Sequence, residues 1–349
     1  MNNLHDKIYM QRCIDLAQQA FGKTYPNPMV GSVIVHNNTI IGEGFHQKAG
    51  EPHAEVLAIN SVVDKSLLAN STLYVNLEPC SHYGKTPPCA NYIVEHAISR
   101  VVIGCVDSFS EVSGRGIAHL QKAGIDVTVG VLEQESRELN KRFFTFHEKK
   151  RPYIILKWAQ TQDGFIDLAP ELKTEKKGLW ITDEICKKLV HKWRTEEQAI
   201  LIGTNTAESD NPQLTARLVQ GNNPLRIVLD LQNRLPEELF IKDKTTPTLI
   251  FTQKDIKSFH NLEYSKICDS TNMWNEIFEE LYKQNIQSLI IEGGAAVLED
   301  CIAHNLWDEM RVFIGPKYFV KGVAAPQLLI NPTSTISVGN SQLKSYFNR

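Results

Sequence analysis

The sequence lacks three features that would place it in a specialised class of proteins. None of its apolar runs approaches the ~20 residues that a membrane-spanning helix needs, so no membrane partner is expected. The formal net charge is -3, whereas nucleic-acid binders are usually basic, so no nucleic-acid partner is expected either. The amino terminus carries no basic and apolar signal-peptide pattern. Together these absences predict a cytoplasmic protein.

Cysteine is also scarce. The 7 cysteines are an odd number scattered over 349 residues, unlike the dense, paired set of a small disulfide-stabilised secreted domain. The hydrophobic fraction of 42% and the charged fraction of 22% are ordinary for a globular protein. Because 349 residues are many for a single core, we expect two domains.

Two of the cysteines and one histidine form a candidate metal site. The histidine stands in the pattern His53-Ala54-Glu55, and the thiols follow at Cys80 and Cys89. One imidazole and two thiolates suit a tetrahedral Zn²⁺ ion that keeps its fourth position for water. The predicted zinc ligands are therefore His53, Cys80 and Cys89.

Glu55 gives this candidate site a chemical role. Zinc-dependent base deaminases carry His-x-Glu followed by Pro-Cys-x-x-Cys, although here eight residues separate Cys80 from Cys89. A bound zinc ion lowers the pKa of its water towards neutrality. Glu55 can take the proton of that water and pass it to a ring nitrogen and then to a departing amino group. Glu55 is thus the predicted catalytic residue of a reaction that releases ammonia.

Two other interpretations of these residues stay open at this point. A closed structural zinc site needs a fourth ligand, for which His82 is the candidate, and the chain would then be a non-catalytic module that senses nucleotides. Alternatively, the first half is a base deaminase that acts on nucleic acid, with an accessory second domain. The carboxylate of Glu55 weighs against the first alternative, and the acidic net charge weighs against the second.

Strand and helix patterns alternate through the first half. The expected strands are the hairpin arms 30–35 and 40–45, followed by 72–77, 101–104 and 127–129, and the expected helices are 6–20, 53–60, 89–97, 116–123 and 133–146. A helix that starts at Cys89 favours its thiolate, because unpaired N–H groups and the helix dipole lie there. The alternation predicts an α/β sandwich around a largely buried sheet.

A charged segment with a proline, 147–152, interrupts every pattern, and we place the boundary there, between domains 1–147 and 151–349. The second half is expected to contain a helix that is capped by Thr182 and runs to Arg194. Its expected strands are 152–159, 199–203, 225–230, 248–251, 288–291 and 309–314. A second α/β domain follows from this pattern.

The Glu292-Gly293-Gly294 stretch is the clearest candidate for a nucleotide site in the second half. It leads from an expected strand into an expected helix, where backbone N–H groups could meet a phosphate. A bare Gly-Gly at a strand end is, however, more often only a tight turn.

Short motifs in both halves resemble one enzyme family. They are Asn27-Pro28-x-Val30-Gly31, Pro79-Cys80-Ser81-His82, the Gly-Lys-Thr-Pro-Pro-Cys run at 84–89, the stretch 157–164, Trp180-Ile181-Thr182, Asp210-Asn211-Pro212-x-Leu214-Thr215-x-Arg217 and Glu292-Gly293-Gly294. Essentially the whole chain is thereby similar to the bacterial bifunctional riboflavin-biosynthesis enzymes, the diaminohydroxyphosphoribosylaminopyrimidine deaminase / 5-amino-6-(5-phosphoribosylamino)uracil reductases. The resemblance implies a cytidine-deaminase-like α/β/α sandwich followed by a dihydrofolate-reductase-like α/β domain, with Zn²⁺ and NADPH as cofactors.

The resemblance also implies two reactions and their binding residues. A zinc-dependent hydrolytic deamination of 2,5-diamino-6-(5-phosphoribosylamino)pyrimidin-4-one would be followed by NADPH-dependent reduction of the ribosyl side chain to ribityl. In the deaminase half, the substrate would be bound by Asn27, His46 and Lys85. In the reductase half, the cofactor would be bound by Ala159, Trp180, Thr206, Asp210, Gly294 and Ala295, and the substrate by Gly178, Arg194, Leu214, Arg217 and Glu292. The family further implies a homo-oligomer, either a dimer or a tetramer.

One stretch departs from the family pattern. The family commonly carries Asp-Pro-Asn-Pro before Val-x-Gly-x-Gly, whereas residues 107–116 keep the glycines and lack the asparagine and both prolines. Without the resemblance, simpler roles would also fit the candidates. Asn27 could form an Asx-turn, Trp180 could belong to the core, and Arg217 could be a solvated side chain.

Overall fold

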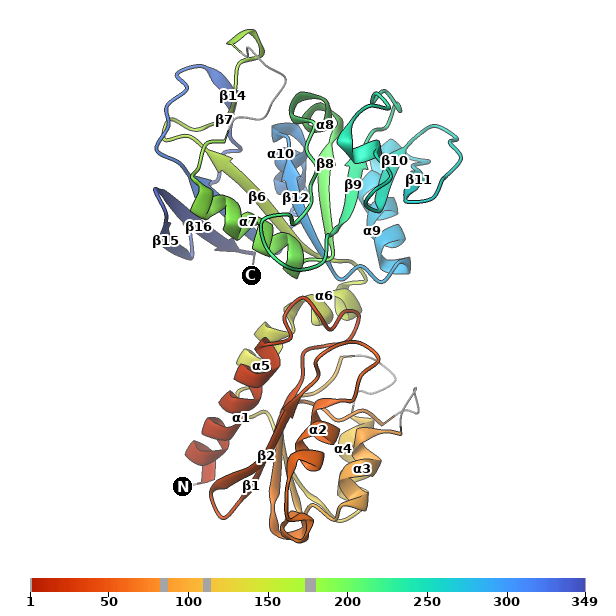
Figure 1. Cartoon of the computed structure of the whole chain (residues 1–349), viewed down its shortest axis with the longest axis vertical. Coiled ribbons are helices and arrows are strands. Elements are labelled where there is room, and N and C mark those ends of the chain that lie inside the picture. Colours follow the sequence, from red (N-terminus) through yellow and green to blue (C-terminus); the bar gives the residue numbers. More distant parts are fainter. Residues whose placement is uncertain (1, 82–86, 109–113, 173–179, 349) are drawn as a thin grey trace. The chain divides into compact units, whose positions relative to one another are not determined.

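The computed structural model describes residues 2–81, 87–108, 114–172 and 180–348 (Figure 1). The chain divides into two compact units, Met1–Lys150 and Arg151–Arg349. The division falls inside the segment 147–152, where charge and a proline interrupt the sequence patterns. Each unit is built around its own large sheet.

The first unit contains a five-stranded sheet with the order β2-β1-β3-β4-β5. Its strands are β1 (Gly31–His36), β2 (Thr39–Phe45), β3 (Thr72–Leu77), β4 (Arg100–Cys105) and β5 (Asp126–Val129). The strands β1 and β2 form the predicted antiparallel hairpin, and β1 also pairs antiparallel with β3. The strands β3, β4 and β5 are parallel, which requires crossover connections between them.

Helices cover both faces of this sheet (Figure 1). They are α1 (Asn2–Gln18), α2 (Ala54–Ser61), α3 (Cys89–Glu95), α4 (Arg115–Lys122), α5 (Glu133–Leu139) and α6 (Lys141–Lys149), with a 3-10 helix at Lys65–Asn70. Successive residues of β1 point to opposite faces. Val33 belongs to the cluster around Met10 of α1, whereas Ile34 packs with Ala58 and Ile59 of α2. This arrangement is the predicted α/β/α sandwich.

The hairpin approaches its covering helices closely at two glycines. A Cβ atom on Gly31 would lie 2.1 Å from the carbonyl oxygen of Cys13 in α1. A Cβ atom on Gly44 would lie 2.6 Å from the Cβ atom of Leu57 in α2. Because only glycine allows such contacts, Gly31 brings α1 directly against the sheet, and Gly44 does the same for α2, which begins next to His53.

The second unit contains a nine-stranded sheet with the order β11-β10-β9-β8-β12-β6-β13-β16-β15. Its strands are β6 (Tyr153–Gln160), β8 (Ala199–Gly203), β9 (Leu225–Leu229), β10 (Thr248–Thr252), β11 (Leu262–Lys266), β12 (Ser288–Gly293), β13 (Glu309–Ile314), β15 (Ser334–Val338) and β16 (Ser341–Phe347). The strands from β11 to β13 pair in parallel, and β16 and β15 add an antiparallel edge. A small antiparallel pair, β7 (Phe165–Leu168) and β14 (Gly322–Ala324), lies outside this sheet.

Helices again cover both faces of the large sheet. One face packs against α7 (Glu184–Glu196) and α8 (Thr204–Asp210), through residues that include Val190 and Ala207. The other face packs against α9 (Met273–Lys283) and α10 (Ala295–Ala303), through residues that include Phe278 and Leu298. Short 3-10 helices occur at Pro170–Leu172, Phe240–Lys242 and Ser270–Asn272.

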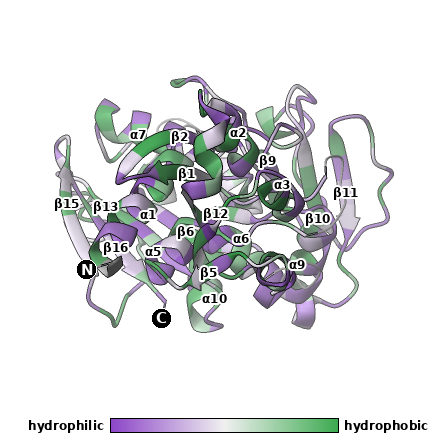
Figure 2. Cartoon of the chain, turned by 90° about the horizontal axis from the view of Figure 1, so that it is seen from below, coloured by the Kyte–Doolittle hydropathy of each residue, from purple (hydrophilic) through white to green (hydrophobic). Residues whose placement is uncertain are grey.

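Hydropathy follows this layered plan. In Figure 2 the strand β1 is mainly hydrophobic, whereas α1 carries both hydrophobic and hydrophilic residues. A strand that is buried between two helical layers needs apolar side chains on both of its faces, and a covering helix needs them on one face only. Among the described residues, every helix is too short or too polar to cross a membrane.

Two local predictions are wrong. The expected helix 133–146 is two helices, α5 and α6, which are interrupted at Asn140. The cap of α7 is Asp183 and not Thr182, because one carboxylate oxygen of Asp183 accepts the backbone N–H groups of Ile185 and Cys186 at 3.1 Å and 3.0 Å. A carboxylate at this position also interacts favourably with the helix dipole.

Candidate active sites

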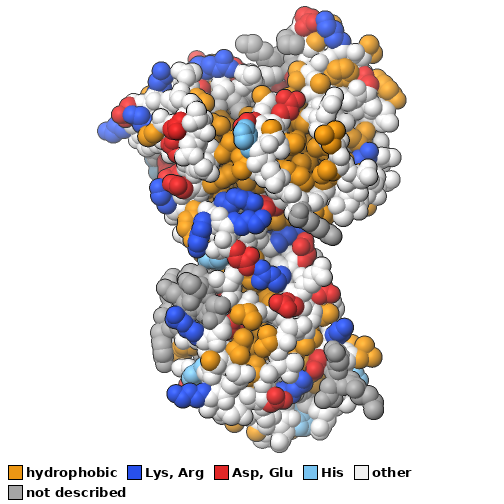
Figure 3. All heavy atoms as spheres, turned by 180° about the vertical axis from the view of Figure 1, so that it is seen from behind, with side chains coloured by type: hydrophobic (Ala, Val, Ile, Leu, Met, Phe, Trp, Pro, Cys, Tyr) orange, Lys and Arg blue, Asp and Glu red, His pale blue; other side chains and the backbone are white. Residues whose placement is uncertain are grey.

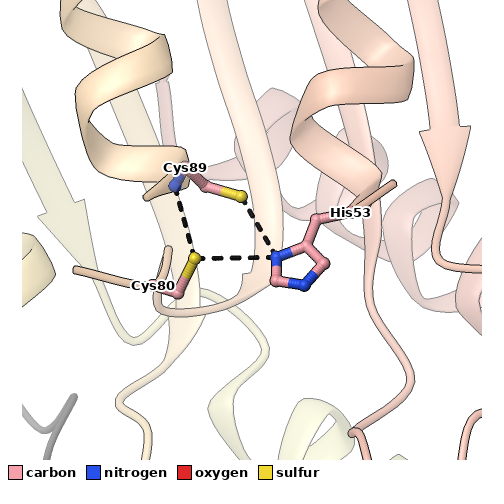
Figure 4. Close-up of side chains that lie close together, drawn as sticks. All are labelled: His53, Cys80 and Cys89. Atoms are coloured by element: carbon pink, nitrogen blue, oxygen red, sulfur yellow. Dashed lines mark hydrogen bonds between the residues drawn. The ribbon is translucent and has the colours of Figure 1, made fainter. Parts of the chain in front are cut away.

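The structure brings His53, Cys80 and Cys89 together (Figure 4). The Nδ1 atom of His53 lies 3.2 Å from the Sγ atom of Cys89 and 3.6 Å from that of Cys80. One ligand atom from each residue lies within 4.8 Å of the other two. Three such donors can hold a tetrahedral zinc ion and leave one position for water, so the residues present fit this metal.

Local structure explains why these three side chains converge. His53 caps the start of α2 in an extended conformation, Cys89 is the first residue of α3, and Cys80 follows β3. The backbone N–H of Cys89 donates to the Sγ atom of Cys80 at 3.3 Å, and the N–H of Ala90 donates to the carbonyl oxygen of Cys80 at 3.1 Å. The first N–H groups of α3 thus point to the chain that follows β3, where they stabilise the thiolate of Cys80.

Proton affinities in this cluster depart from their ordinary values. The pKa of Cys80 is lowered, because Cys89 donates hydrogen bonds to its sulfur and His53 lies beside it. The hydrogen bond with Cys80 raises the pKa of His53 to about 9. Burial raises the pKa of Glu55, which is 3% exposed, to about 7, and the neighbouring His53 acts in the opposite direction. A metal ion that binds here displaces protons from its ligands.

Two of the three predicted substrate contacts in the first unit adjoin this cluster. The ring of His46 lies 5.3 Å from the ring of His53, centroid to centroid, and is nearly perpendicular to it. The Nδ1 atom of His46 lies 3.2 Å from the carbonyl oxygen of Pro52, so this atom carries the proton and donates it. The Nε2 atom therefore accepts a hydrogen bond from Nδ2 of Asn27, at 3.1 Å. Lys85 lies outside the described residues, as does His82, the alternative zinc ligand.

A second cluster of charged side chains lies at the end of β12. Glu292 accepts a hydrogen bond from Arg194 of α7 at 3.2 Å and lies 3.5 Å from the Nζ atom of Lys157 on the adjacent strand β6. Burial acts to raise the pKa of Glu292, but Lys157 and Arg194 together lower it. Burial also lowers the pKa of Lys157. The carboxylate is thus held ionised between two cations.

The segment after α8 completes this cluster. Its Thr215 carbonyl oxygen accepts a hydrogen bond from Nη1 of Arg194 at 3.2 Å. Leu214 is buried and has a positive φ of 55°, and Arg217 is exposed. Burial and the nearby Arg194 lower the pKa of Arg217. The structure therefore groups four of the five predicted substrate residues, and Gly178 lies outside the described residues.

The predicted cofactor residues are only partly grouped. The chain turns from β12 into α10 at Gly293-Gly294, whose peptide bond is cis, and α10 begins at Ala295. A Cβ atom on Gly294 would lie 3.1 Å from the hydroxyl oxygen of Thr206 in α8. The structure thus brings Thr206, Gly294 and Ala295 together.

The other three cofactor candidates occupy separate elements. Ala159 lies on β6, and Asp210 is the last residue of α8. Trp180 is 42% exposed and the ammonium of Lys187 lies 4.6 Å from the centroid of its ring, so this tryptophan is not a core residue. An extended ligand would be needed to contact all three positions.

Comparison with known proteins covers both units. Residues 4–105 match the cytidine and deoxycytidylate deaminase zinc-binding region, and residues 152–331 match the RibD C-terminal domain. The riboflavin biosynthesis protein RibD of Aquifex aeolicus (strain VF5) is 40% identical over 329 residues, which cover 93% of this chain and 90% of that protein. The chain belongs to the RibD family. RibD of Escherichia coli (strain K12) is 35% identical and covers 90% of this chain and 88% of its own length.

Solved structures of RibD proteins resemble both units at once. A diaminohydroxyphosphoribosylaminopyrimidine deaminase / 5-amino-6-(5-phosphoribosylamino)uracil reductase from Thermotoga maritima is 35% identical, with a TM-score of 0.87 and 99% of each chain covered. Acinetobacter baumannii RibD is 30% identical, with a TM-score of 0.88 and the same coverage. The predicted fold class is confirmed. Like its RibD relatives, the chain is a bifunctional deaminase and reductase of riboflavin biosynthesis.

The two matched regions also support the predicted cofactors. The zinc-binding region includes His53, Cys80 and Cys89, which supports Zn²⁺. The RibD C-terminal domain is the reductase part of the family and supports NADPH.

Sequence reasoning missed a carboxylate that supports the deaminase cluster of this RibD protein. Glu78 is 4% exposed and precedes Cys80 by two residues. Its Oε1 atom accepts the backbone N–H groups of Gly116 and Ile117 at 2.9 Å and 3.2 Å. Its Oε2 atom accepts those of Gly114 and Asp107 at 3.0 Å and 3.3 Å. One side chain thus ties Asp107, Gly114, Gly116 and Ile117 to the strand end that is followed by Cys80.

Two asparagines hold the segment that contains Asn27. Asn140, at the break between α5 and α6, accepts the N–H of Met29 at 2.8 Å and donates to the carbonyl oxygen of Met29 at 2.9 Å. Asn76 of β3 accepts the N–H of Gly31 at 2.7 Å and donates to the same Met29 carbonyl at 3.1 Å. Both residues are remote from Met29 in the sequence, so no local pattern could reveal this role.

Proposed function

We propose that residues 1–147 carry out the deamination of 2,5-diamino-6-(5-phosphoribosylamino)pyrimidin-4-one and that residues 151–349 reduce the ribosyl side chain of the product. The observation that carries this proposal is the convergence of His53, Cys80 and Cys89 within 4.8 Å, with the buried carboxyl group of Glu55 beside them. A structural zinc site would have no use for this carboxylate. A hydrolytic deaminase needs a proton carrier at that place.

In the deaminase site the protein residues bind the ion and move protons. His53, Cys80 and Cys89 would hold Zn²⁺, which when bound makes a water molecule nucleophilic near neutral pH. Glu55 would accept a proton from the attacking water and deliver it to the pyrimidine ring nitrogen. It would then take the second proton, from the hydroxyl group that the attack places on the ring carbon, and pass it to the amino group, which leaves as ammonia while a carbonyl forms on the ring. Almost complete burial raises the pKa of the Glu55 carboxyl group above its ordinary value, which suits a group that both takes up and returns protons.

Asn27, His46 and Lys85 would bind the substrate of the deaminase. The hydrogen bond from Asn27 Nδ2 to His46 fixes the orientation of the Asn27 amide. Its Oδ1 atom is then the group that can accept a hydrogen bond from an amino group of the pyrimidine. Lys85 would contribute a positive charge to the substrate phosphate. Asn76 and Asn140 support this arrangement, because they hold the backbone at Met29.

In the reductase site Arg194, Arg217 and Glu292 would bind the substrate together with Gly178 and Leu214. The two guanidinium groups lie near each other, since Arg194 lowers the pKa of Arg217. A phosphate between them would relieve this repulsion and receive bidentate hydrogen bonds. Glu292 is ionised and would accept hydrogen bonds from hydroxyl groups of the sugar.

The cofactor of the reductase would lie along Ala159, Trp180, Thr206, Asp210 and the turn at Gly294 and Ala295. NADPH when bound supplies the hydride that C1′ of the opened sugar accepts. Backbone N–H groups at the start of α10 and the hydroxyl of Thr206 suit a phosphate group of this cofactor. The ammonium of Lys157, whose pKa is lowered by burial, could supply the accompanying proton.

We further propose that the enzyme works in the cytoplasm as a homo-oligomer, a dimer or a tetramer, on a small-molecule substrate. Light scattering of the purified chain would measure its mass, and a purely monomeric mass at micromolar concentration would contradict the oligomer.

A nucleic-acid substrate is the less favoured alternative. The net charge is -3, and Lys and Arg side chains are interspersed with Asp and Glu on the face of each unit shown in Figure 3. Tight binding of RNA at low salt would favour that alternative.

A coupled assay tests both reactions on one sample. The purified chain is given the diamino substrate and NADPH, and ammonia release, NADPH oxidation and zinc content are measured together. We expect ammonia release to begin first and NADPH oxidation to follow as the deaminated product forms. Ammonia release should depend on the first unit, and NADPH oxidation should depend on the second. A zinc-loaded chain that releases no ammonia would contradict the deaminase proposal, and one that deaminates without oxidising NADPH would contradict the reductase proposal.

A further inference from the structure

His191 is a buried imidazole that the proposed reductase mechanism does not use. It lies on α7, three residues before Arg194, and is 0% exposed. Its Nδ1 atom accepts a hydrogen bond from the backbone N–H of Leu218 at 3.4 Å. A ring nitrogen that accepts a hydrogen bond carries no proton, so the proton of the neutral ring lies on Nε2.

The surroundings of His191 keep this ring neutral. Burial, Arg194 and Arg217 lower its pKa to about 4, and only the negative charge of Glu292 acts noticeably against them. The Nδ1 atom therefore remains an acceptor at neutral pH. The Nε2 atom of His191 and the Nε atom of Arg194 are buried and have no hydrogen-bond partner among the described residues. An apolar side chain would fill the same space without a buried unpaired N–H group, so packing alone does not explain an imidazole here.

The segment that His191 contacts is the one that carries Arg217. This segment is held at three points. Arg194 donates to the Thr215 carbonyl oxygen at 3.2 Å, Asn223 accepts the N–H of Ala216 at 2.9 Å, and His191 accepts the N–H of Leu218. The last two contacts lie immediately on either side of Arg217. Because Arg217 is exposed and is repelled by Arg194, its backbone must be anchored if its side chain is to stay near that charge.

We propose that His191 is a positioning residue of the reductase site, which holds the backbone at Leu218 through Nδ1 and so keeps Arg217 within reach of the phosphate of the substrate. The inference rests on the proposed reductase function. It assigns His191 no contact with the reacting atoms. Its effect should therefore fall on the binding of the phosphorylated substrate and neither on hydride transfer nor on the binding of NADPH.

Two substitutions separate this role from simple packing. His191→Asn keeps an acceptor, since the Oδ1 atom of asparagine can take the place of Nδ1, whereas His191→Leu keeps most of the volume and removes the acceptor. Steady-state NADPH oxidation is measured with the deaminated phosphoribosylamino substrate on the full chain. We expect His191→Leu to raise the KM for this substrate by about three- to tenfold, as for the loss of one hydrogen bond, with kcat and the KM for NADPH nearly unchanged. His191→Asn should restore most of the lost affinity.

Ammonia release by the same samples is the internal control, because the deaminase site lies in the other unit. If His191→Leu lowers the melting temperature and leaves the KM for the substrate unchanged, His191 is a packing residue and the proposal is overturned. The same conclusion follows if His191→Asn and His191→Leu raise this KM equally. Should His191→Leu fail to fold, His191→Gln, whose amide lies near the position of Nε2, replaces it with the same expected rise in KM. A wild-type chain that does not oxidise NADPH would instead overturn the reductase proposal, and the role of His191 with it.

Discussion

Substitution of Glu78 by glutamine tests how the deaminase site is held together. The carboxylate of Glu78 accepts four backbone N–H groups, two on each oxygen. Glutamine keeps the shape but replaces one oxygen by an amino group, so two N–H groups lose their acceptor and face a donor instead. Hydrogen bonds to a charged group contribute about 1.5–3 kcal/mol each. Since one bond on each oxygen is longer than 3.1 Å, we take the lower value and expect a loss of about 3 kcal/mol.

This loss should appear locally before it appears globally. A change of about 3 kcal/mol corresponds to roughly a hundredfold change in an opening equilibrium, because each 1.4 kcal/mol is tenfold. Hydrogen exchange of the amides at Gly114, Gly116 and Ile117 should therefore accelerate by about two orders of magnitude in Glu78→Gln. The displaced strand end carries Cys80, so zinc affinity measured by competition with a chelator should fall by about 10- to 100-fold, as for other residues that orient metal ligands.

Glu95→Gln is the matched control, because Glu95 is exposed on α3 and its substitution makes the same change in charge. NADPH oxidation from the deaminated substrate should be unaffected in both variants. If exchange at residues 114–117 and zinc affinity are the same in Glu78→Gln and Glu95→Gln, the four hydrogen bonds do not hold this site, and the reasoning is refuted.

Four further outcomes are expected. Glu55→Gln should keep zinc and lose about 10²- to 10⁴-fold in the rate of ammonia release, as for the removal of a general acid-base group. Removal of zinc by a chelator should abolish ammonia release and leave NADPH oxidation from the deaminated substrate intact. Arg194→Ala should mainly raise the reductase KM for its substrate, whereas Arg234→Ala, which removes a half-exposed arginine of the same unit, should not. Asp6→Asn should lower the stability of the first unit at neutral pH and flatten its loss of stability in acid.

The sign of the Asp6 effect follows from its contacts. Burial acts to raise the pKa of Asp6, but hydrogen bonds from Arg100 and Tyr74 lower it overall. A carboxylate with a lowered folded-state pKa stabilises the protein above its ordinary pKa of about 3.9, and this contribution is lost as the pH falls through the folded-state value. Urea unfolding of the wild type and the variant between neutral pH and about pH 3 measures this difference.

Each of these outcomes can fail in a recognisable way. Normal ammonia release by Glu55→Gln would remove Glu55 from the mechanism. Parallel loss of both activities on chelation would mean that zinc supports the whole chain and not one site. An unchanged KM in Arg194→Ala would exclude this arginine from the substrate site, and identical pH profiles for the wild type and Asp6→Asn would show that the Arg100 pair contributes nothing measurable.

The sequence by itself predicted most strands of the two large sheets and the candidate metal ligands, but not the edge strands β11, β15 and β16. Runs of apolar residues bounded by turn residues located β3, β8 and β13 at their observed limits, because a buried strand needs continuous apolar side chains. The residue types and spacing of His53, Cys80 and Cys89 predict a set of three soft metal donors, since few other roles require that set together with Glu55. These signals are local or chemically specific, so they can be read along the chain.

Only the tertiary structure decided which residues support these sites. Asn140, at the break between α5 and α6, binds the backbone of Met29, which lies far along the chain. Asp183 makes local cap bonds but also accepts the distant N–H of Asn340. Glu78 and His191 likewise bind backbone N–H groups that become their neighbours only when the sheets and helices pack. A backbone N–H group is the same in every residue except proline. The sequence pattern around a backbone N–H group therefore does not indicate which distant side chain accepts its hydrogen bond, and only the folded chain shows that acceptor.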